Sequence, residues 1–148
     1  MLAQGQRYSE VTVGQSFSET LTITAAHLTL GAALIGDFNP LHVDEGFARR
    51  SRYGERILHG VLTGAIIGAP LGMRFAGTAI GYLEQQCKFL APVRTGDTLV
   101  TTWTVTSLLD KPKHGGGVVG LRAVCLNQTG KRVAEASGAM LVADGLVA

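Results

Sequence analysis

Residues 60–73 read Gly-Val-Leu-Thr-Gly-Ala-Ile-Ile-Gly-Ala-Pro-Leu-Gly-Met, and no charged residue occurs between His59 and Arg74. The stretch is shorter than the roughly 18 apolar residues that a membrane span requires, so it indicates a helix buried within protein. A helix that is apolar on every side is expected to be buried on every side. The stretch therefore predicts a central helix around which the rest of the chain packs.

Glycines recur at every fourth position of this predicted helix, at Gly60, Gly64, Gly68 and Gly72. Residues at this spacing lie along one line of a helix surface. An interior glycine costs a helix about 1 kcal/mol relative to alanine, so the series is tolerable where another element packs unusually close. The pattern predicts a sheet wrapped tightly over this face of the helix.

The segments outside the central stretch alternate between apolar and polar residues, which is the period of half-buried β-strands. One such segment precedes the helix and four follow it, at residues 16–24, 81–92, 97–109, 117–129 and 131–143. Short turn-like connections at residues 94–97 and 128–131 predict that the last four strands form an antiparallel meander. We therefore predict an α+β fold, an antiparallel β-sheet wrapped around a long central α-helix, in a single domain spanning residues 1–148.

Two shorter helical segments are predicted between the first strand and the central helix. Thr24 is a suitable cap for a helix that buries Leu28 and Ala32 and ends at Gly36. A short helical turn is expected over residues 44–50, followed by an arginine-rich connector over residues 49–56.

The composition excludes several classes of protein. Hydrophobic residues make up 46% of the chain and charged residues only 16%, against a usual charged share of about 25%, which excludes a disordered chain and favours an oligomer. The net charge of +2, without a sustained basic stripe, argues against nucleic acid as a partner. No segment is long enough to span a membrane.

Cysteine usage and the first residues bear on location and cofactors. Cys87 and Cys125 lie in strand-like segments without metal-ligand spacing, so we expect both to be reduced and buried. Residues 1–7 lack the apolar core of a secretion signal, which favours a cytoplasmic protein. Neither a metal-ligand cluster nor a dinucleotide fingerprint is present, so no metal or redox cofactor is expected.

The segment Gly-Asp-Phe-Asn-Pro-Leu-His-Val-Asp at residues 36–44 concentrates an acid, an amide and an imidazole around a proline. Pro40 fixes its own φ and forces Asn39 into an extended conformation. Such a turn can bring Asp37 and His42 together, where both side chains can hold one water molecule. The alternative is that Asp37 caps a helix, that Asn39 and Pro40 form a turn, and that His42 is structural.

The sequence Ile-Leu-His-Gly at residues 57–60 precedes the central helix. Backbone N–H groups in the first turn of a helix are unpaired and attract anions. Gly60 is therefore placed to donate to a developing oxyanion, although close packing explains the same glycine and is compatible with that role. His59 is interpreted as a structural residue that caps the helix or fills space.

The chain resembles the MaoC-like, (R)-specific enoyl-CoA hydratases of the hot-dog fold. The resemblance rests on residues 35–42, 47–48 and 57–62, and extends to residues 89–93 and 96–97. It implies an antiparallel sheet around a long helix and a homodimer with a continuous sheet. The implied reaction is hydration of 2-enoyl-CoA thioesters, or the reverse dehydration of 3-hydroxyacyl-CoA, with coenzyme A entering as part of the substrate.

The resemblance also implies roles for individual residues. Asp37 and His42 would be the catalytic pair that activates water, Asn39 an orienting amide, and the Gly60 N–H the oxyanion donor. Many relatives carry an aromatic side chain about two helical turns before the acid, whereas this chain has Leu-Gly-Ala at residues 30–32. For this reason the resemblance is not extended to a preference for acyl chain length, and a short, branched or hydroxylated acyl group is compatible with the sequence.

Arginines near the expected site are candidates for binding the phosphates of coenzyme A. They are Arg49, Arg52 and Arg94. The alternative is that these arginines belong to a solvated surface.

Two other functions are compatible with the resemblance. A hot-dog thioesterase would hydrolyse the thioester, but such enzymes often place a carboxylate on the central helix, and residues 60–73 contain no Asp or Glu. A non-catalytic acyl-CoA-binding subunit would need the fold without Asp37 and His42. A hydratase or dehydratase is therefore the leading hypothesis.

Overall fold

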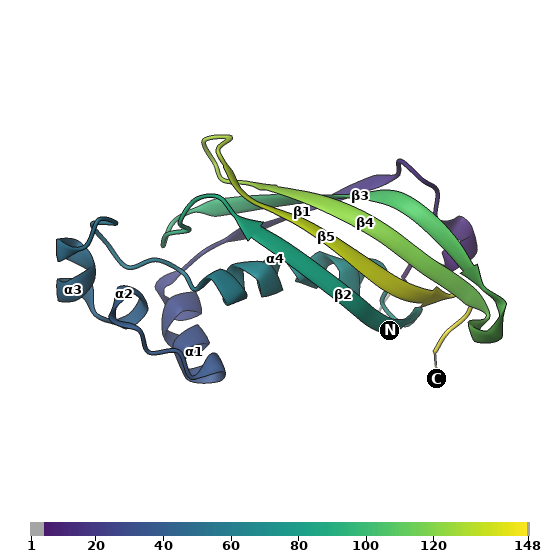
Figure 1. The fold of residues 1–148 in the computed structure, drawn as a ribbon, viewed down its shortest axis with the longest axis horizontal. Helices are drawn as coiled ribbons and strands as arrows, with labels where there is room; N and C mark the ends of the chain where they lie inside the picture. Colours follow the sequence, from purple (N-terminus) through teal and green to yellow (C-terminus); the bar gives the residue numbers. More distant parts are fainter. Residues whose placement is uncertain (1–4, 148) are drawn as a thin grey trace.

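The computed structural model describes residues 5–147. The prediction that residues 1–7 lack a secretion signal rests partly on residues 1–4, which lie outside the described residues. Five strands, four α-helices and two short 3-10 helices make up the fold (Figure 1). In chain order they are η1 (Tyr8–Glu10), β1 (Ser16–Thr22), α1 (Ala25–Ile35), α2 (Pro40–Val43), α3 (Glu45–Arg50), α4 (Gly60–Arg74), β2 (Ala79–Phe89), β3 (Thr98–Lys111), η2 (Pro112–His114), β4 (Gly116–Leu126) and β5 (Arg132–Ala143).

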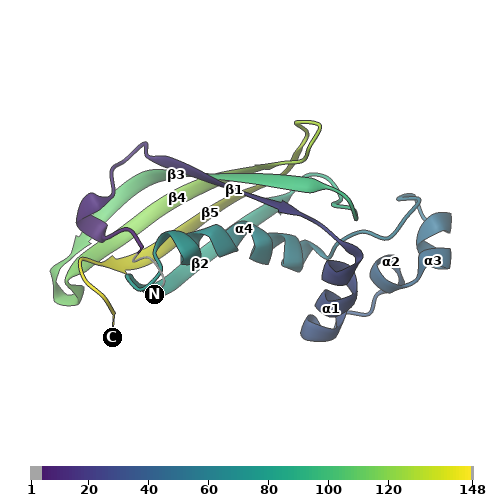
Figure 2. The same ribbon diagram turned by 180° about the vertical axis from the view of Figure 1, so that it is seen from behind.

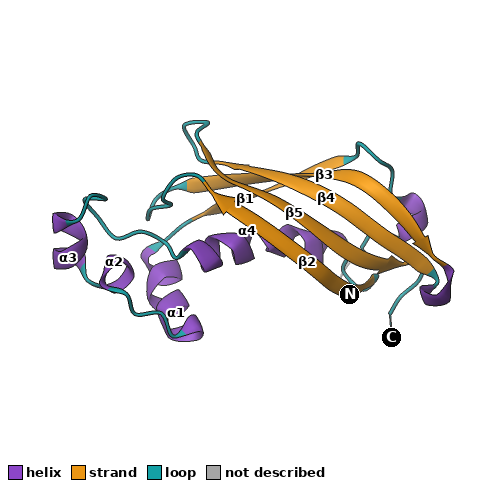
Figure 3. Ribbon diagram, viewed as in Figure 1, coloured by secondary structure: helices purple, strands orange, loops and turns teal. Residues whose placement is uncertain are grey.

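The strands form one sheet in the order β1-β3-β4-β5-β2, in which all neighbouring strands are antiparallel. The sheet is a single curved layer, and α4 runs along its inner face (Figure 3). The predicted architecture, a sheet curled around a central helix, is therefore confirmed. Helices α1, α2 and α3 extend beyond one end of the sheet (Figure 2).

The glycine line of α4 faces β2. A Cβ atom on Gly60 would lie 3.3 Å from Cε2 of Phe89, and one on Gly64 would lie 3.4 Å from Sγ of Cys87. Gly68 packs still closer, against Gln85. A Cβ on Gly72 would meet nothing within 4 Å, so the close approach predicted from the glycines holds for the first three of them.

The prediction that α4 is buried on every side is wrong for the single chain. Ile67 and Leu71 are fully buried under the sheet, whereas Val61 is 63% exposed and Met73 is 66% exposed. The sheet covers only the side of the helix that faces it. Much of the opposite side remains open because α1, α2 and α3 lie beyond the sheet's end.

The prediction that all four later strands form one meander is only partly correct. Strands β3, β4 and β5 pair in succession, but β2 pairs with β5 at the far edge of the sheet. A turn does form at residues 94–97, where the N–H of Asp97 donates to the Arg94 carbonyl at 3.1 Å. After β2, the chain uses this turn to cross the end of the sheet and begin β3. The crossing is needed because β2, which follows directly after α4, lies along the glycine face of the helix and is not a neighbour of β3.

Trp103 joins the sheet to the central helix. Its side chain is fully buried, and its indole N–H donates to the carbonyl oxygen of Ile67 in α4 at 2.8 Å. Burial of such a large ring contributes strongly to stability, and the buried N–H has found the partner it requires. This contact fixes the helix against β3.

Both ends of the described chain lie near the carboxyl end of α4 (Figure 1). The N–H of Gly5 donates to the carbonyl of Ala76 at 2.7 Å, and the N–H of Val147 donates to that of Gly77 at 2.8 Å. The helix therefore separates both chain ends from its own amino end at Gly60.

Candidate active site

Asp37 lies directly after α1, which ends as predicted at Gly36, where a left-handed φ of +73° turns the chain. Its Oδ1 accepts the N–H of Asn39 at 3.0 Å, a bond that fixes the carboxylate within its own turn. The side chain is 47% exposed. One carboxylate oxygen, Oδ2, is thus directed toward His42 and available to a substrate.

His42 lies on α2, a short helix that the sequence analysis did not foresee. Its Nδ1 is 2.8 Å from the carbonyl oxygen of Ile57, and since a carbonyl only accepts, this nitrogen carries the proton in the neutral ring. Nε2 then offers a lone pair, 3.9 Å from Oδ2 of Asp37. A water molecule at about 2.8 Å from both atoms fits this separation, so the structure brings together the two side chains that the sequence predicted to meet.

Asn39 bonds to Asp37 through its backbone N–H, whereas its side chain caps the helix that carries His42. Its side-chain oxygen accepts the N–H of Leu41 at 3.1 Å and caps α2, whose first residue is Pro40. An N-cap of this kind stabilises the first turn of a helix, and here that helix carries His42. The backbone of Asn39, as noted above, holds the Asp37 carboxylate.

Gly60 is the first residue of α4 and lines a cleft of about 300 Å³ at the amino end of the helix. Tyr53, Ile57, Thr63 and Phe89 contribute to the walls of this cleft. The N–H groups of a first helical turn have no partner within the helix, so they are available to a negatively charged oxygen in the cleft. The sequence analysis predicted Gly60 as an oxyanion donor, and this role stays a prediction.

His59 is the residue whose surroundings the sequence did not reveal. The residue is 1% exposed, and its ring stacks on that of His42, with centroids 3.7 Å apart and planes inclined by 29°. Its Nε2 lies 2.9 Å from the backbone carbonyl oxygen of Asp37. The side chain makes no capping bond to α4, so the interpretation as a helix cap is not supported.

Asp37, His42 and His59 each present a potential ligand atom, and the three atoms lie within 4.8 Å of one another. Metal ligands need a similar spacing, and the sequence spacing did not indicate this cluster. The nitrogens of a metal-binding imidazole point at the ion in the plane of the ring. Two rings stacked at 3.7 Å and inclined by only 29° do not converge on one ion, so the geometry favours proton chemistry.

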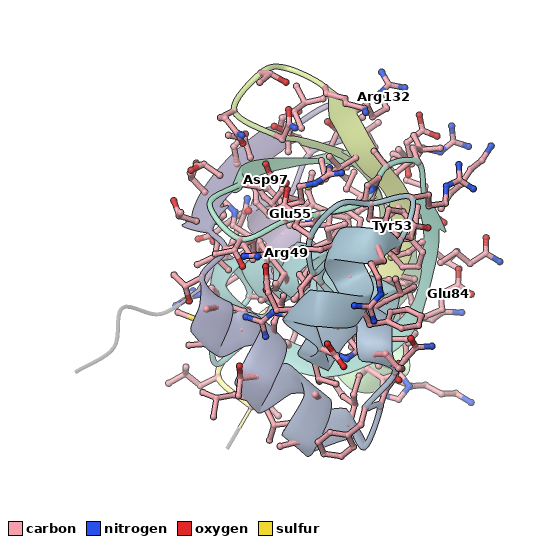
Figure 4. The ribbon with its side chains drawn as sticks, turned by 90° about the vertical axis from the view of Figure 1, so that its left-hand side faces the viewer. Arg49, Tyr53, Glu55, Glu84, Asp97 and Arg132 are labelled. Carbon is pink, nitrogen blue, oxygen red and sulfur yellow. The ribbon has the colours of Figure 1, made fainter. Side chains whose placement is uncertain are left out.

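The three candidate arginines have different surroundings. Arg94 Nε lies 2.9 Å from Oε1 of Glu55, and its Nη2 donates to the Tyr53 carbonyl at 3.3 Å. Arg49 Nε lies 3.5 Å from Oε1 of Glu45 on α3. Figure 4 looks onto the end of the molecule that carries α1, α2 and α3, and shows Arg49, Tyr53 and Glu55 there.

Arg52 is the third candidate, and its guanidinium carbon lies 5.9 Å from the centre of the Tyr53 ring. Tyr53 also lines the cleft at Gly60. Arg94 and Arg52 therefore both contact a residue of the cleft wall, whereas the partner found for Arg49 is on α3. A larger depression of about 600 Å³ lies on the sheet among β2, β4 and β5, and none of the predicted site residues lines it.

Comparison with known protein families identifies the family of this chain. The family model described as "MaoC like domain" matches residues 9–124, which include Asp37, His42 and Gly60. The chain belongs to the MaoC-like family. Its sheet and central helix form the hot-dog fold.

Similar proteins extend over most of this MaoC-like chain. It is 38% identical over 135 residues to the (R)-specific enoyl-CoA hydratase of Rhodospirillum rubrum, covering 91% of this chain and 90% of that protein. It is 34% identical to the 3-hydroxybutyryl-CoA dehydratase of Methylorubrum extorquens, covering 72% of this chain and 68% of the relative.

A solved structure supports the same relationship. The unliganded R-hydratase PhaJ1 from Pseudomonas aeruginosa superposes with a TM-score of 0.83 at 34% sequence identity, covering 95% of this chain and 88% of that one.

In residues 5–147 of this MaoC-like protein, no helix has both the length and the apolar character needed to cross a membrane.

Proposed function

We propose that the protein catalyses (R)-specific hydration of 2-enoyl-CoA thioesters, or the reverse dehydration of 3-hydroxyacyl-CoA. The observation that carries this proposal is the 3.9 Å separation of Asp37 Oδ2 and His42 Nε2, beside the unpaired amino end of α4. The relatives named above are an (R)-specific enoyl-CoA hydratase, a 3-hydroxybutyryl-CoA dehydratase and an R-hydratase.

In the hydration direction, Asp37 accepts a proton from the water molecule while the oxygen of that water forms a bond to C3. His42 Nε2 holds the same water by hydrogen bonding, and its Nδ1–H remains bonded to Ile57. The proton held by Asp37 is then delivered to C2, so that the elements of water are added across the double bond. General acid–base catalysis of this kind contributes about 10² to 10⁴ in rate.

Negative charge develops on the thioester oxygen when water adds to C3. In the proposed reaction the N–H of Gly60 at the amino end of α4 receives this oxygen, and a single oxyanion donor is worth about 2.7 to 4 kcal/mol. The absence of a Cβ at Gly60 lets the oxygen approach the backbone. The proposed chemistry requires no metal or redox group, since coenzyme A enters as part of the substrate.

The first experiment is incubation with crotonyl-CoA, following the absorbance of the conjugated thioester together with a free-thiol reagent. Loss of conjugation without free thiol supports hydration, and chiral chromatography of the product tests for the (R) alcohol. Release of thiol with an intact double bond would instead support a thioesterase. If a series of longer and branched enoyl thioesters is also unchanged, the hydratase proposal fails in favour of the binding subunit.

We also propose that the protein is a homodimer joined along β2. This strand is an edge of the sheet and exposes apolar side chains, including Tyr82 at 46% and Leu83 at 54%. An edge strand with free backbone groups and apolar side chains readily pairs with another strand. Light scattering is expected to show a dimer, and Leu83→Lys is expected to shift it toward the monomer; a monomeric wild type would contradict the proposal.

A cytoplasmic location is proposed as well. It is supported by the two free cysteines, Cys87 and Cys125, since reducing compartments keep thiols in this state. Cell fractionation tests this location, which would be contradicted by recovery of the protein outside the cytoplasm.

A further inference from the structure

His59 is a buried imidazole that the proposed mechanism leaves without a role. Only 1% of the residue is exposed, yet it contacts both members of the water-activating pair. Its ring stacks on His42 and its Nε2 lies 2.9 Å from the main-chain carbonyl oxygen of Asp37. It also directly precedes Gly60, so one residue is connected to the acid, the imidazole and the oxyanion donor.

The hydrogen bond to Asp37 assigns the tautomer of His59. The carbonyl oxygen of Asp37 can only accept, so Nε2 of His59 must carry the proton. In the neutral ring Nδ1 then has no hydrogen, and this buried nitrogen has no hydrogen-bond partner within residues 5–147. His42 has the opposite arrangement, because its Nδ1 is bonded to the Ile57 carbonyl.

Space filling alone does not account for this residue. A buried polar atom without a partner lowers stability, and a phenyl ring would fill a similar volume without leaving a nitrogen unpaired. Departures from a well-satisfied core are expected where function requires them. The N–H bond to the segment that carries Asp37 is the contact that an apolar ring could not make.

The stacked contact restrains His42 in a second way. A single hydrogen bond from Nδ1 to Ile57 fixes one atom of the His42 ring but leaves the ring able to swing about that bond. The face of His59, with its centroid 3.7 Å away, blocks this swing on one side. The two contacts of His59 therefore act on the two residues whose side-chain atoms, Asp37 Oδ2 and His42 Nε2, lie 3.9 Å apart.

We propose that His59 is a positioning residue that sets the distance and orientation between Asp37 and His42. The proposal rests on the hydratase function proposed above. The Nε2–H bond holds the main chain at Asp37, and the ring face holds the imidazole of His42. In this role His59 acts only through these two residues.

Two variants separate the contacts. His59→Phe keeps a flat ring and loses the N–H donor, and its kcat with crotonyl-CoA is expected to fall about 10- to 100-fold, with little change in KM, because small misplacements of reacting groups are costly. His59→Gln keeps a donor near the position of Nε2 and loses the ring, and its kcat is expected to lie between those of wild type and His59→Phe. Phe75→Leu, a core change at the other end of α4, serves as a control for loss of stability and is expected to retain kcat.

A double variant tests whether His59 acts through Asp37. If it does, adding His59→Phe to Asp37→Asn lowers kcat by far less than it does in the wild type, because the group being positioned is already lost. A kcat for His59→Phe within about twofold of wild type, fully additive losses in the double variant, or a slower His59→Gln than His59→Phe would each overturn the proposal.

Nitrogen NMR gives a readout that does not depend on turnover. Proton–nitrogen spectra of the neutral histidine rings are expected to show the Nε2–H form for His59 and the Nδ1–H form for His42. In His59→Gln, which loses the ring face that holds His42, the Nδ1–H of His42 is expected to exchange faster with solvent. Unchanged exchange in the variant would overturn the positioning role of His59 even if the wild type showed no hydratase activity. Faster exchange in the variant, together with a wild type that is inactive, would reject the proposed function alone.

Discussion

The imidazole of His42 donates through Nδ1 to the carbonyl oxygen of Ile57 at 2.8 Å. Ile57 belongs to the segment that leads directly into α4, so this bond ties the proposed water-holding group to the segment that ends at Gly60. The separation between the two parts of the site is thereby set by main-chain positions rather than by a flexible side chain. The proposed water-holding imidazole and the amino end of α4 are therefore already in position before a substrate binds.

Replacement of Asp37 by Asn is expected to lower kcat about 10²- to 10⁴-fold, because the amide cannot accept the proton of water. The Asn oxygen can still accept the N–H of Asn39, and the side chain is 47% exposed, so Tm should not change. Steady-state kinetics with crotonyl-CoA and thermal unfolding measure the two effects.

A matched control is Asp44→Asn, since Asp44 caps α3 by accepting the Phe47 N–H at 2.8 Å. Asn is an equally good cap, and this variant should keep wild-type activity. An Asp37→Asn enzyme that retains full activity would remove the proposed acid–base mechanism.

Gly60→Ala is expected to lower kcat with crotonyl-CoA by roughly 10- to 100-fold, because the added methyl group crowds the N–H that we propose receives the oxyanion. The new Cβ would lie 3.3 Å from Phe89, so some loss could come from packing alone. Gly64→Ala controls for this effect, since its Cβ would lie 3.4 Å from Cys87 one turn further along. Equal losses of kcat in the two variants would argue against an oxyanion role.

Arg94→Ala is expected to raise KM for crotonyl-CoA about tenfold, the value of one charge-assisted hydrogen bond to a phosphate. The KM for a crotonyl-pantetheine thioester, which lacks the nucleotide phosphates, should not change. Glu55→Gln removes the partner of Arg94 at 2.9 Å while leaving the cation in place, and it should not raise either KM. If Arg94→Ala raises both KM values equally, the arginine is structural.

Trp103→Phe is expected to lower stability by about 2 kcal/mol and Tm by roughly 5 °C, because it leaves a cavity and removes a buried hydrogen bond. The indole is fully buried and donates to Ile67 at 2.8 Å. Urea unfolding measures the free energy, and a change below about 0.5 kcal/mol would show that this contact does not hold α4 against the sheet.

Cys125 is expected to resist thiol reagents in the native protein. Burial raises the pKa of its thiol above the usual value, so less of the reactive thiolate is present at a given pH near 8 than for a free cysteine. The Cys87→Ser variant isolates Cys125, and thiol titration should be slow in buffer and complete in urea. Rapid reaction in buffer would show that the β4 face carrying Cys125 opens readily.

The strands and the central helix were predictable because each has its own periodicity. Alternation identified all five strands, and the apolar run from Gly60 identified α4. The partner of β2 was not predictable, since the turn at residues 94–97 signals a reversal without specifying which strand lies alongside. The sequence analysis missed the open side of α4 for a related reason. An apolar pattern indicates that a helix is buried, but it does not indicate whether elements of the same chain cover every side of that helix.

The proximity of Asp37 and His42 was predictable because Pro40 separates them within one short segment. His59 is distant from both in sequence, and its contacts depend on how the start of α4 meets the end of α1. A local pattern contains no information about that meeting. The side chain of Asn39 also differs from a simple expectation, since it caps α2 rather than touching the acid.

The anchoring of Gly5 to Ala76 and of Val147 to Gly77 has a practical consequence. Both attachment points lie past the carboxyl end of α4, a helix of 15 residues, which places them roughly 20 Å from Gly60 at 1.5 Å per residue. An affinity tag, a fluorophore or a solid support joined at either terminus is therefore held away from the mouth of the site. Immobilised or fused forms should turn over crotonyl-CoA as fast as the free enzyme.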